Sequence, residues 1–169
     1  EGCGLAGKPV TSENISFALA PRLNAAGRME TASTALQLLL CEDFEKAQAL
    51  TARLNQANAD RQAAEQTILS EAEAQIAADP ARLRDRVLLV WGEGFHPGVI
   101  GIVASRLVEK YARPVLVISV QNGEGKGSGR SVPGFNLHGA ISACASVLIR
   151  FGGHAMAAGL SVKEENIPA

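Results

Sequence analysis

The sequence predicts an α/β fold in which a helical connector is followed by a mixed sheet with flanking helices. Two observations support this fold class. Residues 31–78 contain neither glycine nor proline and are rich in Ala, Leu, Gln and Glu, a composition typical of helices. After residue 80, runs of β-branched residues alternate with amphipathic segments, as in sheets layered with helices. We therefore expect a compact α/β domain at residues 82–169.

Residues 1–30 are interrupted by glycine and proline, so we expect mostly loop, with a short helix or strand around residues 15–20. Residues 31–80 should then form two helices that break near residues 41–43, where the Asp43 side chain can cap the second helix. Apolar residues of that helix follow three-four spacing, which predicts one narrow buried face. It would span about 50 Å, more than a small domain needs for its core. We interpret it as a connector between domains, with a coiled-coil arm as the alternative.

The predicted α/β domain contains six elements in the order strand, helix, strand, strand, helix, strand. Their expected ranges are 87–91, 99–111, 115–120, 127–132, 137–151 and 160–162.

The composition limits the kind of protein. With 47% hydrophobic and 20% charged residues, the chain is typical of soluble globular proteins. A formal net charge of -1 provides no overall basic field, so a polyanion would have to be held by a local patch of arginines. Three widely spaced cysteines argue against a disulfide framework and a zinc site, and Cys41 and Cys144 are expected to be buried. No membrane helix or signal peptide is visible, so we expect a cytoplasmic protein.

Two segments carry polar residues that packing alone does not require. In the first, Arg22 and Arg28 flank Asn24 and small residues in an expected turn, and guanidinium groups suit phosphate oxygens. Arginines exposed on an ordinary loop are the alternative. In the second, His96 lies in a glycine-rich turn between a predicted strand end and a helix start, where anions commonly bind. A turn histidine with its hydrogen bonds satisfied is the alternative there.

Two further segments combine glycines with potential phosphate ligands. Alternation along an extended segment places Ser128 and Arg130 on one face, beside glycines that leave room for a ligand. A flexible exposed hairpin is the alternative. His154 follows Gly152 and Gly153 at the end of the second predicted helix, where a glycine pair could approach phosphate or simply cap the helix.

The sequence contains no recognisable catalytic motif. His96 and His154 are the credible acid–base candidates, and no Ser-His-Asp arrangement is present. Together with Glu93 they make a poor metal-ligand set, because metal hydrolysis needs several carboxylates and histidines around the ion. We therefore predict anion-binding groups, and no catalytic or metal-ligating residue, in this chain.

The motifs at residues 21–28, 96–104, 127–131 and 152–159 resemble, in order and spacing, those of the RecJ family of single-stranded-DNA-specific exonucleases. These enzymes belong to the DHH phosphoesterase superfamily. The resemblance implies an N-terminal domain with an Asp-His-His motif that holds two Mn²⁺ or Mg²⁺ ions, a long connecting helix, and a second α/β domain that binds substrate. The Asp-His-His motif is absent from this chain.

By this resemblance, residues 1–30 are the end of the DHH domain, residues 31–80 the connector and residues 82–169 the DHH-associated substrate-binding domain. The whole protein would be a 5′-to-3′ exonuclease that hydrolyses single-stranded DNA by two-metal catalysis in DNA repair and recombination. The chain would be the C-terminal part of the catalytic core, inactive alone and without a cofactor of its own. Repair or replication proteins are possible partners of the full-length chain.

The resemblance also implies roles for individual residues. Ser128 and Arg130 match positions that hold the 5′-terminal phosphate, Arg22 and Arg28 match a motif near the DNA path, and the Gly-Gly-His motif ending at His154 faces the metal site. The full set of expected substrate- or phosphate-binding residues is Arg22, Asn24, Arg28, His96, Ser128, Arg130, Gly152, Gly153 and His154. Few aromatic residues are available for base stacking, so binding should rest on phosphate contacts.

Two other functions remain open from the sequence. One is a non-catalytic nucleic-acid- or nucleotide-binding module. The other is a related phosphodiesterase that degrades very short RNA or cyclic dinucleotides with a similar Gly-Gly-His domain. The arginine-flanked motif and the long connector favour the RecJ family.

Overall fold

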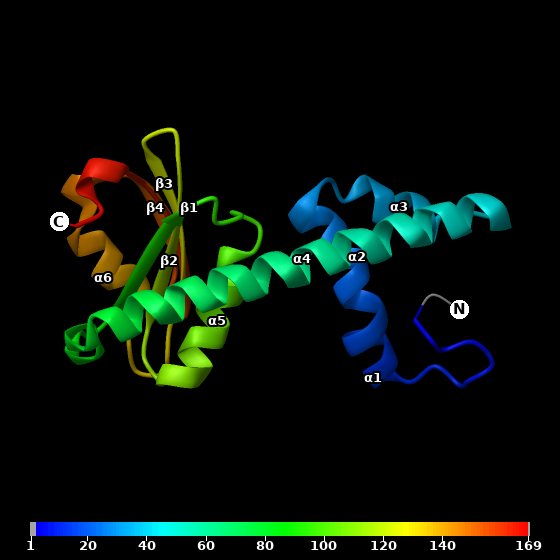
Figure 1. Ribbon diagram of the computed structural model, residues 1–169, viewed down its shortest axis with the longest axis horizontal. Helices are drawn as coiled ribbons and strands as arrows, with labels where there is room; N and C mark the ends of the chain where they lie inside the picture. The colour runs from blue at the N-terminus through cyan, green and yellow to red at the C-terminus, as the bar shows by residue number, and fades with distance from the viewer. Residues whose placement is uncertain (1–2, 169) are drawn as a thin grey trace. The chain divides into compact units, whose positions relative to one another are not determined.

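The computed structural model describes residues 3–168, and the chain forms two compact units, Glu1–Ala63 and Ala64–Ala169. The boundary lies within the long helix α4 (Phe44–Ala78), inside the predicted connector. Figure 1 shows this helix contributing residues to both units. Its 35 residues correspond to about 50 Å, as the sequence predicted.

The first unit is helical from Ser12 onward. It contains α1 (Ser12–Asn14), a π-helical turn (Ile15–Leu19), α2 (Ala20–Met29), α3 (Ser33–Leu39) and the first half of α4. The prediction that residues 1–30 are mostly loop is therefore wrong. Pro21 directly follows the π-helical turn, in which the Ala20 N–H donates to the Ile15 carbonyl, and the helical path continues through this residue although it has no N–H.

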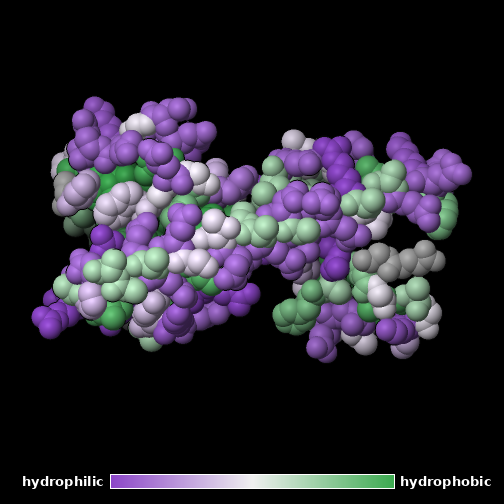
Figure 2. Space-filling model, in the orientation of Figure 1, coloured by the Kyte–Doolittle hydropathy of each residue, from purple (hydrophilic) through white to green (hydrophobic). Residues whose placement is uncertain are grey.

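The predicted helix break near residues 41–43 is confirmed, since α3 ends at Leu39 and α4 begins at Phe44. The Lys46 N–H donates to Asp43 Oδ1 at 3.0 Å, which caps the start of α4 as predicted. The buried face of α4 is narrow and contains Leu54, Ala57, Ile68, Ala72 and Ile76. In Figure 2 the side of α4 that faces the viewer mixes hydrophilic and weakly hydrophobic residues, as expected of a helix with one narrow buried face.

The second unit contains a five-stranded mixed sheet in the order β1-β2-β3-β5-β4. The strands β1 (Leu88–Glu93) and β2 (Val115–Gln121) are parallel, and α5 (Ile100–Tyr111) connects them. The remaining neighbours, β3 (Glu124–Arg130), β5 (Ala157–Lys163) and β4 (Leu148–His154), pair antiparallel. The predicted α/β class with a mixed sheet is confirmed.

The prediction of one helix over residues 137–151 is wrong. The helix α6 ends at Ala143, a 3₁₀ turn covers Ala145–Val147, and β4 begins at Leu148. Residues 148–151 are apolar enough to fit either state, and pairing with β5 selects the strand. The Gly-Gly-His segment therefore lies at a strand end, which removes the helix-cap interpretation.

The two faces of the sheet are covered by different helices. Figure 1 shows α5 beside the second half of α4, and Lys110 of α5 pairs with Glu73 of α4 at 2.7 Å. This hydrogen bond raises the pKa of the Lys110 amine. On the opposite face, Leu137 and Ile141 of α6 (Leu137–Ala143) pack against the sheet and share a core with Leu160.

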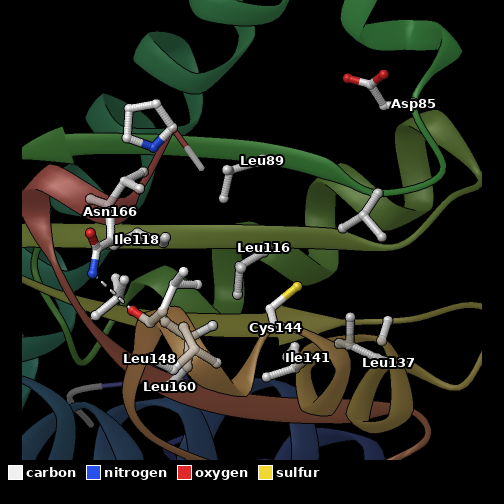
Figure 3. A pocket seen from close by; sticks show the side chains of 16 residues that line it. Asp85, Leu89, Leu116, Ile118, Leu137, Ile141, Cys144, Leu148, Leu160 and Asn166 are labelled. Atoms are coloured by element: carbon white, nitrogen blue, oxygen red, sulfur yellow. Dashed lines mark hydrogen bonds between the residues drawn. The ribbon is translucent and has the colours of Figure 1, made fainter.

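An apolar groove runs along the α6 face of the sheet (Figure 3). Leu89, Leu116 and Ile118 line it from the sheet, and Ile141 and Cys144 line it from the α6 side. The expected burial of the cysteines is wrong, since Cys144 is exposed here and Cys41 is only partly buried.

Candidate nucleic-acid interface

Three antiparallel strands, β3, β5 and β4, bring two of the predicted motifs together. Ser128 is paired with Gly159, and Gly159 is paired in turn with Gly152. Residues directly opposite each other in an antiparallel pair project to the same face of the sheet. Ser128 and Gly152 therefore share one face, although 24 positions separate them in the sequence.

The next row on this face contains Arg130, Ala157 and His154. Since strand residues two apart share a face, Arg130 and Ser128 lie together, as the alternation predicted. Arg130 Nη1 donates to Ser128 Oγ at 3.2 Å and to the Gly129 carbonyl at 2.8 Å. The arginine and the histidine belong to strands that flank β5, so their backbones are about 10 Å apart.

A third motif reaches this face through Gly101, in the first turn of α5. A Cβ atom placed on Gly101 would lie 2.9 Å from Ser128 Oγ and 3.0 Å from Arg130 Nη2. The two side chains therefore pack directly against the helix start, and they do so because residue 101 has no side chain. The sequence indicated the segment that contains Gly101 as a candidate site, but it did not predict the contact of Gly101 with Ser128 and Arg130.

Lys126 and Arg150 extend the same face by one more row. Both are paired with Ser161 of β5, and Arg150 Nε donates to Ser161 Oγ at 3.2 Å. Neither was predicted as a site residue. The alternation that joined Ser128 to Arg130 also includes Lys126, whereas Arg150 could be placed only once the pairing of β4 was known.

We call this surface the basic strand face. It consists of Lys126, Ser128, Arg130, Arg150, Gly152, His154, Ala157, Gly159 and Ser161. A Cβ atom on Gly152 would meet nothing within 4 Å, so the surface beside it is open. A ligand can therefore approach the strand backbone between the cationic side chains.

Gly153 has a different role from Gly152. Its φ is +143°, and a Cβ atom on it would lie 2.4 Å from the Ala157 carbonyl oxygen. It lies on the opposite face of β4 from Gly152 and His154. The backbone conformation at residue 153 thus requires glycine. At residue 152 there is open space where a side chain would be.

His154 is exposed at the end of β4, and its ring orientation is set by the hairpin turn. The Met156 N–H donates to His154 Nδ1 at 3.3 Å. In the neutral imidazole this hydrogen bond assigns the proton to Nε2, which is then a donor. Residues outside the hairpin also stabilise this turn: the Ser131 N–H donates to the Met156 carbonyl, and the Leu137 N–H donates to the Ala155 carbonyl.

His96 is a half-buried turn residue. Its Nδ1 accepts from the Gly98 N–H at 3.1 Å, and its carbonyl oxygen accepts from the N–H groups of Val99 and Ile100. These bonds match the alternative of a turn histidine with satisfied hydrogen bonds. They stabilise the turn before α5, and this turn positions Gly101 against the basic strand face.

The three predicted residues of the first unit lie on a helix instead of a turn. Arg22, Asn24 and Arg28 all belong to α2. Asn24 and Arg28, four apart, lie on one side of the helix, whereas Arg22 lies about 120° away from Arg28. Arg22 is half-buried, and its Nε donates to Asn55 Oδ1 at 2.8 Å.

Neither a metal cluster nor a membrane helix is found in the part of the chain that the structure describes. Residues 3–168 contain no group of three or more His, Cys, Asp or Glu that could hold a metal ion. No helix among them is long and apolar enough to span a bilayer.

Comparison with known proteins gives consistent results. The model of the DHHA1 domain matches residues 84–169. The chain is 42% identical over 158 residues to the single-stranded-DNA-specific exonuclease RecJ of Bacillus subtilis, covering 92% of this chain and 20% of that protein. It is 41% identical over 169 residues to the RecJ of Thermus thermophilus, covering 100% of this chain and 24% of that protein. The chain thus spans a fifth to a quarter of these relatives.

Solved structures agree with the sequence comparison. The crystal structure of RecJ from Thermus thermophilus in complex with Mg²⁺ matches with a TM-score of 0.82 and 34% identity, over 99% of this chain and 26% of that chain. The crystal structure of exonuclease RecJ bound to manganese matches with a TM-score of 0.85 and 37% identity, over 98% of this chain and 40% of that chain.

Proposed function

The chain belongs to the DHHA1 domain family, and from this we propose that it is the substrate-binding portion of a 5′-to-3′ single-stranded-DNA exonuclease. The similarity to RecJ proteins supports this, since it covers 92% to 100% of the chain, including α4 and the first unit. The observation that carries the proposal is the basic strand face, where the Ser128–Arg130 motif and the Gly-Gly-His motif share one open surface. Action in DNA repair and recombination, a cytoplasmic location and contacts with repair or replication proteins belong to the same proposal.

In this proposal Arg130 and Ser128 hold the 5′-terminal phosphate. Arg130 Nη1 is oriented by Ser128 Oγ and the Gly129 carbonyl, and its other N–H groups can bond phosphate oxygens. Because Ser128 Oγ accepts from Arg130, its own proton is available for the same phosphate. A charge-assisted pair of this kind is stronger than a neutral hydrogen bond.

His154 would bind a second part of the backbone, near the reacting phosphodiester. Its Nδ1 is occupied by the Met156 N–H, so Nε2–H is the group that donates to a phosphate oxygen. The open surface beside Gly152 lets the strand come close to the β4 backbone. We assign His154 to substrate binding.

Metal ions belong to the proposal for the full-length protein. The related structures are described as bound to Mg²⁺ or manganese. The described residues of this chain do not fit such a site, because no three potential ligands converge. We therefore assign metal-dependent phosphodiester hydrolysis to other parts of the full-length protein and expect the isolated chain to be inactive.

The test uses the full-length enzyme with Arg130→Ala and, as a matched control, Arg86→Ala, an exposed arginine outside the basic strand face. Values of kcat/KM are measured on single-stranded oligonucleotides with a 5′-phosphate or a 5′-hydroxyl. Loss of a charged hydrogen bond should lower kcat/KM on the phosphorylated strand by roughly 10- to 100-fold and reduce the preference for a 5′-phosphate. An unchanged preference would remove Arg130 from the phosphate site.

The same assay separates the alternatives. Short RNA and cyclic dinucleotides are offered to the unmodified enzyme beside single-stranded DNA. Faster hydrolysis of either would favour the related phosphodiesterases, and binding of DNA without hydrolysis of any substrate would favour a non-catalytic module. Preferential hydrolysis of single-stranded DNA from the 5′ end is the result that we expect.

A further inference from the structure

Lys126 and Arg150 lie on either side of a buried serine. Each is paired with Ser161 in the strand register, one from β3 and one from β4. Ser161 is 6% exposed, whereas the lysine and the arginine are exposed. Arg150 Nε donates to Ser161 Oγ at 3.2 Å, which holds the guanidinium over the neighbouring strand.

A hollow of about 390 Å³ lies at this row, a size common for small-ligand sites. Lys126, Arg150 and Ser161 line it together with Gly152 and Gly159. The two glycines also belong to the row of Ser128. The hollow is therefore continuous with the surface that holds the Ser128–Arg130 motif.

The charge at this row is not neutralised within the described chain. Neither Lys126 nor Arg150 forms an ion pair with an acidic residue among residues 3–168. Lys126 and Arg150 lie on the two strands that flank β5, so their backbones are about 10 Å apart, and an anion above Ser161 would be attracted by both charges. The following row pairs Glu124 with Lys163, so the uncompensated positive charge ends there.

We propose that Lys126, Arg150 and Ser161 form a second anion subsite, which binds a backbone phosphate of the same nucleic-acid strand. The subsite lies about 7 Å along β3 from Ser128, one step of two residues. A single extended strand can therefore contact both subsites through different phosphates. The identification of the ligand as a nucleic-acid phosphate rests on the proposed function. The evidence for an anion subsite, which is the two cationic side chains and the hollow beside them, does not depend on that function.

The test uses the full-length protein with divalent metals chelated, so that the ligand is not cut. The variants are Lys126→Ala and Arg150→Ala, with Lys110→Ala as the control, a lysine on α5 that pairs with Glu73. Dissociation constants are measured for a 5′-phosphorylated mononucleotide and for 5′-phosphorylated single strands of two to six nucleotides, at several salt concentrations.

We expect both variants to weaken binding of the longer strands by roughly 3- to 30-fold and to lower the salt dependence, because one phosphate contact is lost. Mononucleotide binding and the preference for a 5′-phosphate should not change. Arg150→Lys should recover part of the affinity that Arg150→Ala loses, and the melting temperature of each variant shows that the fold is retained.

The outcomes separate the two proposals. If Arg130→Ala weakens binding but neither Lys126→Ala nor Arg150→Ala changes affinity or salt dependence, the second subsite is overturned and the proposed function stands. If the full-length protein binds no single-stranded DNA, the proposed function fails. In that case weaker binding of inorganic polyphosphate by Lys126→Ala and Arg150→Ala would still support an anion subsite, and unchanged binding would overturn it.

Discussion

Arg22 donates its Nε–H to the side-chain oxygen of Asn55 at 2.8 Å, so a residue of α4 fixes the guanidinium of an α2 arginine. The same guanidinium donates from Nη1 to the Ala18 carbonyl at 2.6 Å, one helical turn earlier. Two bonds therefore set the direction of this side chain. Asn55 acts through Arg22 and is a positioning residue for it.

Replacing Asn55 tests this relationship. In the full-length enzyme, Asn55→Ala should raise KM for single-stranded DNA by about three- to tenfold with a smaller change in kcat. Without the hydrogen bond to Asn55, the Arg22 side chain is more mobile in the free enzyme, and ordering it on binding phosphate costs free energy. Arg22→Ala should have a larger effect. Asn55→Asp keeps the acceptor oxygen but adds a negative charge beside Arg22, so it should hold the guanidinium in place without restoring the full affinity for phosphate. A purely structural role would instead lower the melting temperature with KM unchanged.

Gly101→Ala tests the contact between the start of α5 and the Ser128–Arg130 pair. The added methyl group would lie 2.9 Å from Ser128 Oγ and 3.0 Å from Arg130 Nη2, so both side chains must move. Alanine is the better helix former by about 1 kcal/mol, which should largely preserve stability. We expect a selective loss of kcat/KM on 5′-phosphorylated strands. Equal effects on phosphorylated and unphosphorylated strands would contradict this contact model.

The sequence predicted this surface only in part, and the physical reason lies in the range of each interaction. Ser128 and Arg130 could be placed on one face because side-chain alternation along a strand is a local property. Their proximity to Gly152 depends on pairing through β5, which is set by distant parts of the chain. Arg150 was missed for the same reason, since its partner Ser161 was known only from the register.

The errors in the helices have local causes. Pro21 was interpreted as a loop signal, although the helical path continues through it directly after a π-helical turn. The segment after Ala143 contains Leu, Ile and Phe residues that suit a buried helix or a strand equally. Pairing with β5 decides between these two states, and it cannot be seen in the local sequence. The Gly-Gly-His motif was therefore predicted at a helix end, whereas in the structure it lies in the β4–β5 hairpin.

Adjacent glycines allow a paired experiment. Gly153→Ala should destabilise the second unit by about 2 kcal/mol or more, because φ is +143° and the new methyl group would meet the Ala157 carbonyl oxygen at 2.4 Å. Gly152→Ala should leave the melting temperature nearly unchanged, since its methyl group would meet nothing within 4 Å. It should nevertheless weaken DNA binding by narrowing the open surface. Equal stability of the two variants would show that the backbone at residue 153 tolerates a side chain.

His154→Asn separates the two ring nitrogens of the histidine. The asparagine side chain can still accept from the Met156 N–H as Nδ1 does, but it is too short to replace the Nε2–H donor. We expect the hairpin and the melting temperature to be retained, and kcat/KM on single-stranded DNA to fall by roughly 10- to 100-fold. His154→Gln, whose longer amide can reach the Nε2 position, should recover part of that loss. If the asparagine variant keeps full activity, Nε2 does not contact the substrate, and the role of His154 is limited to the turn.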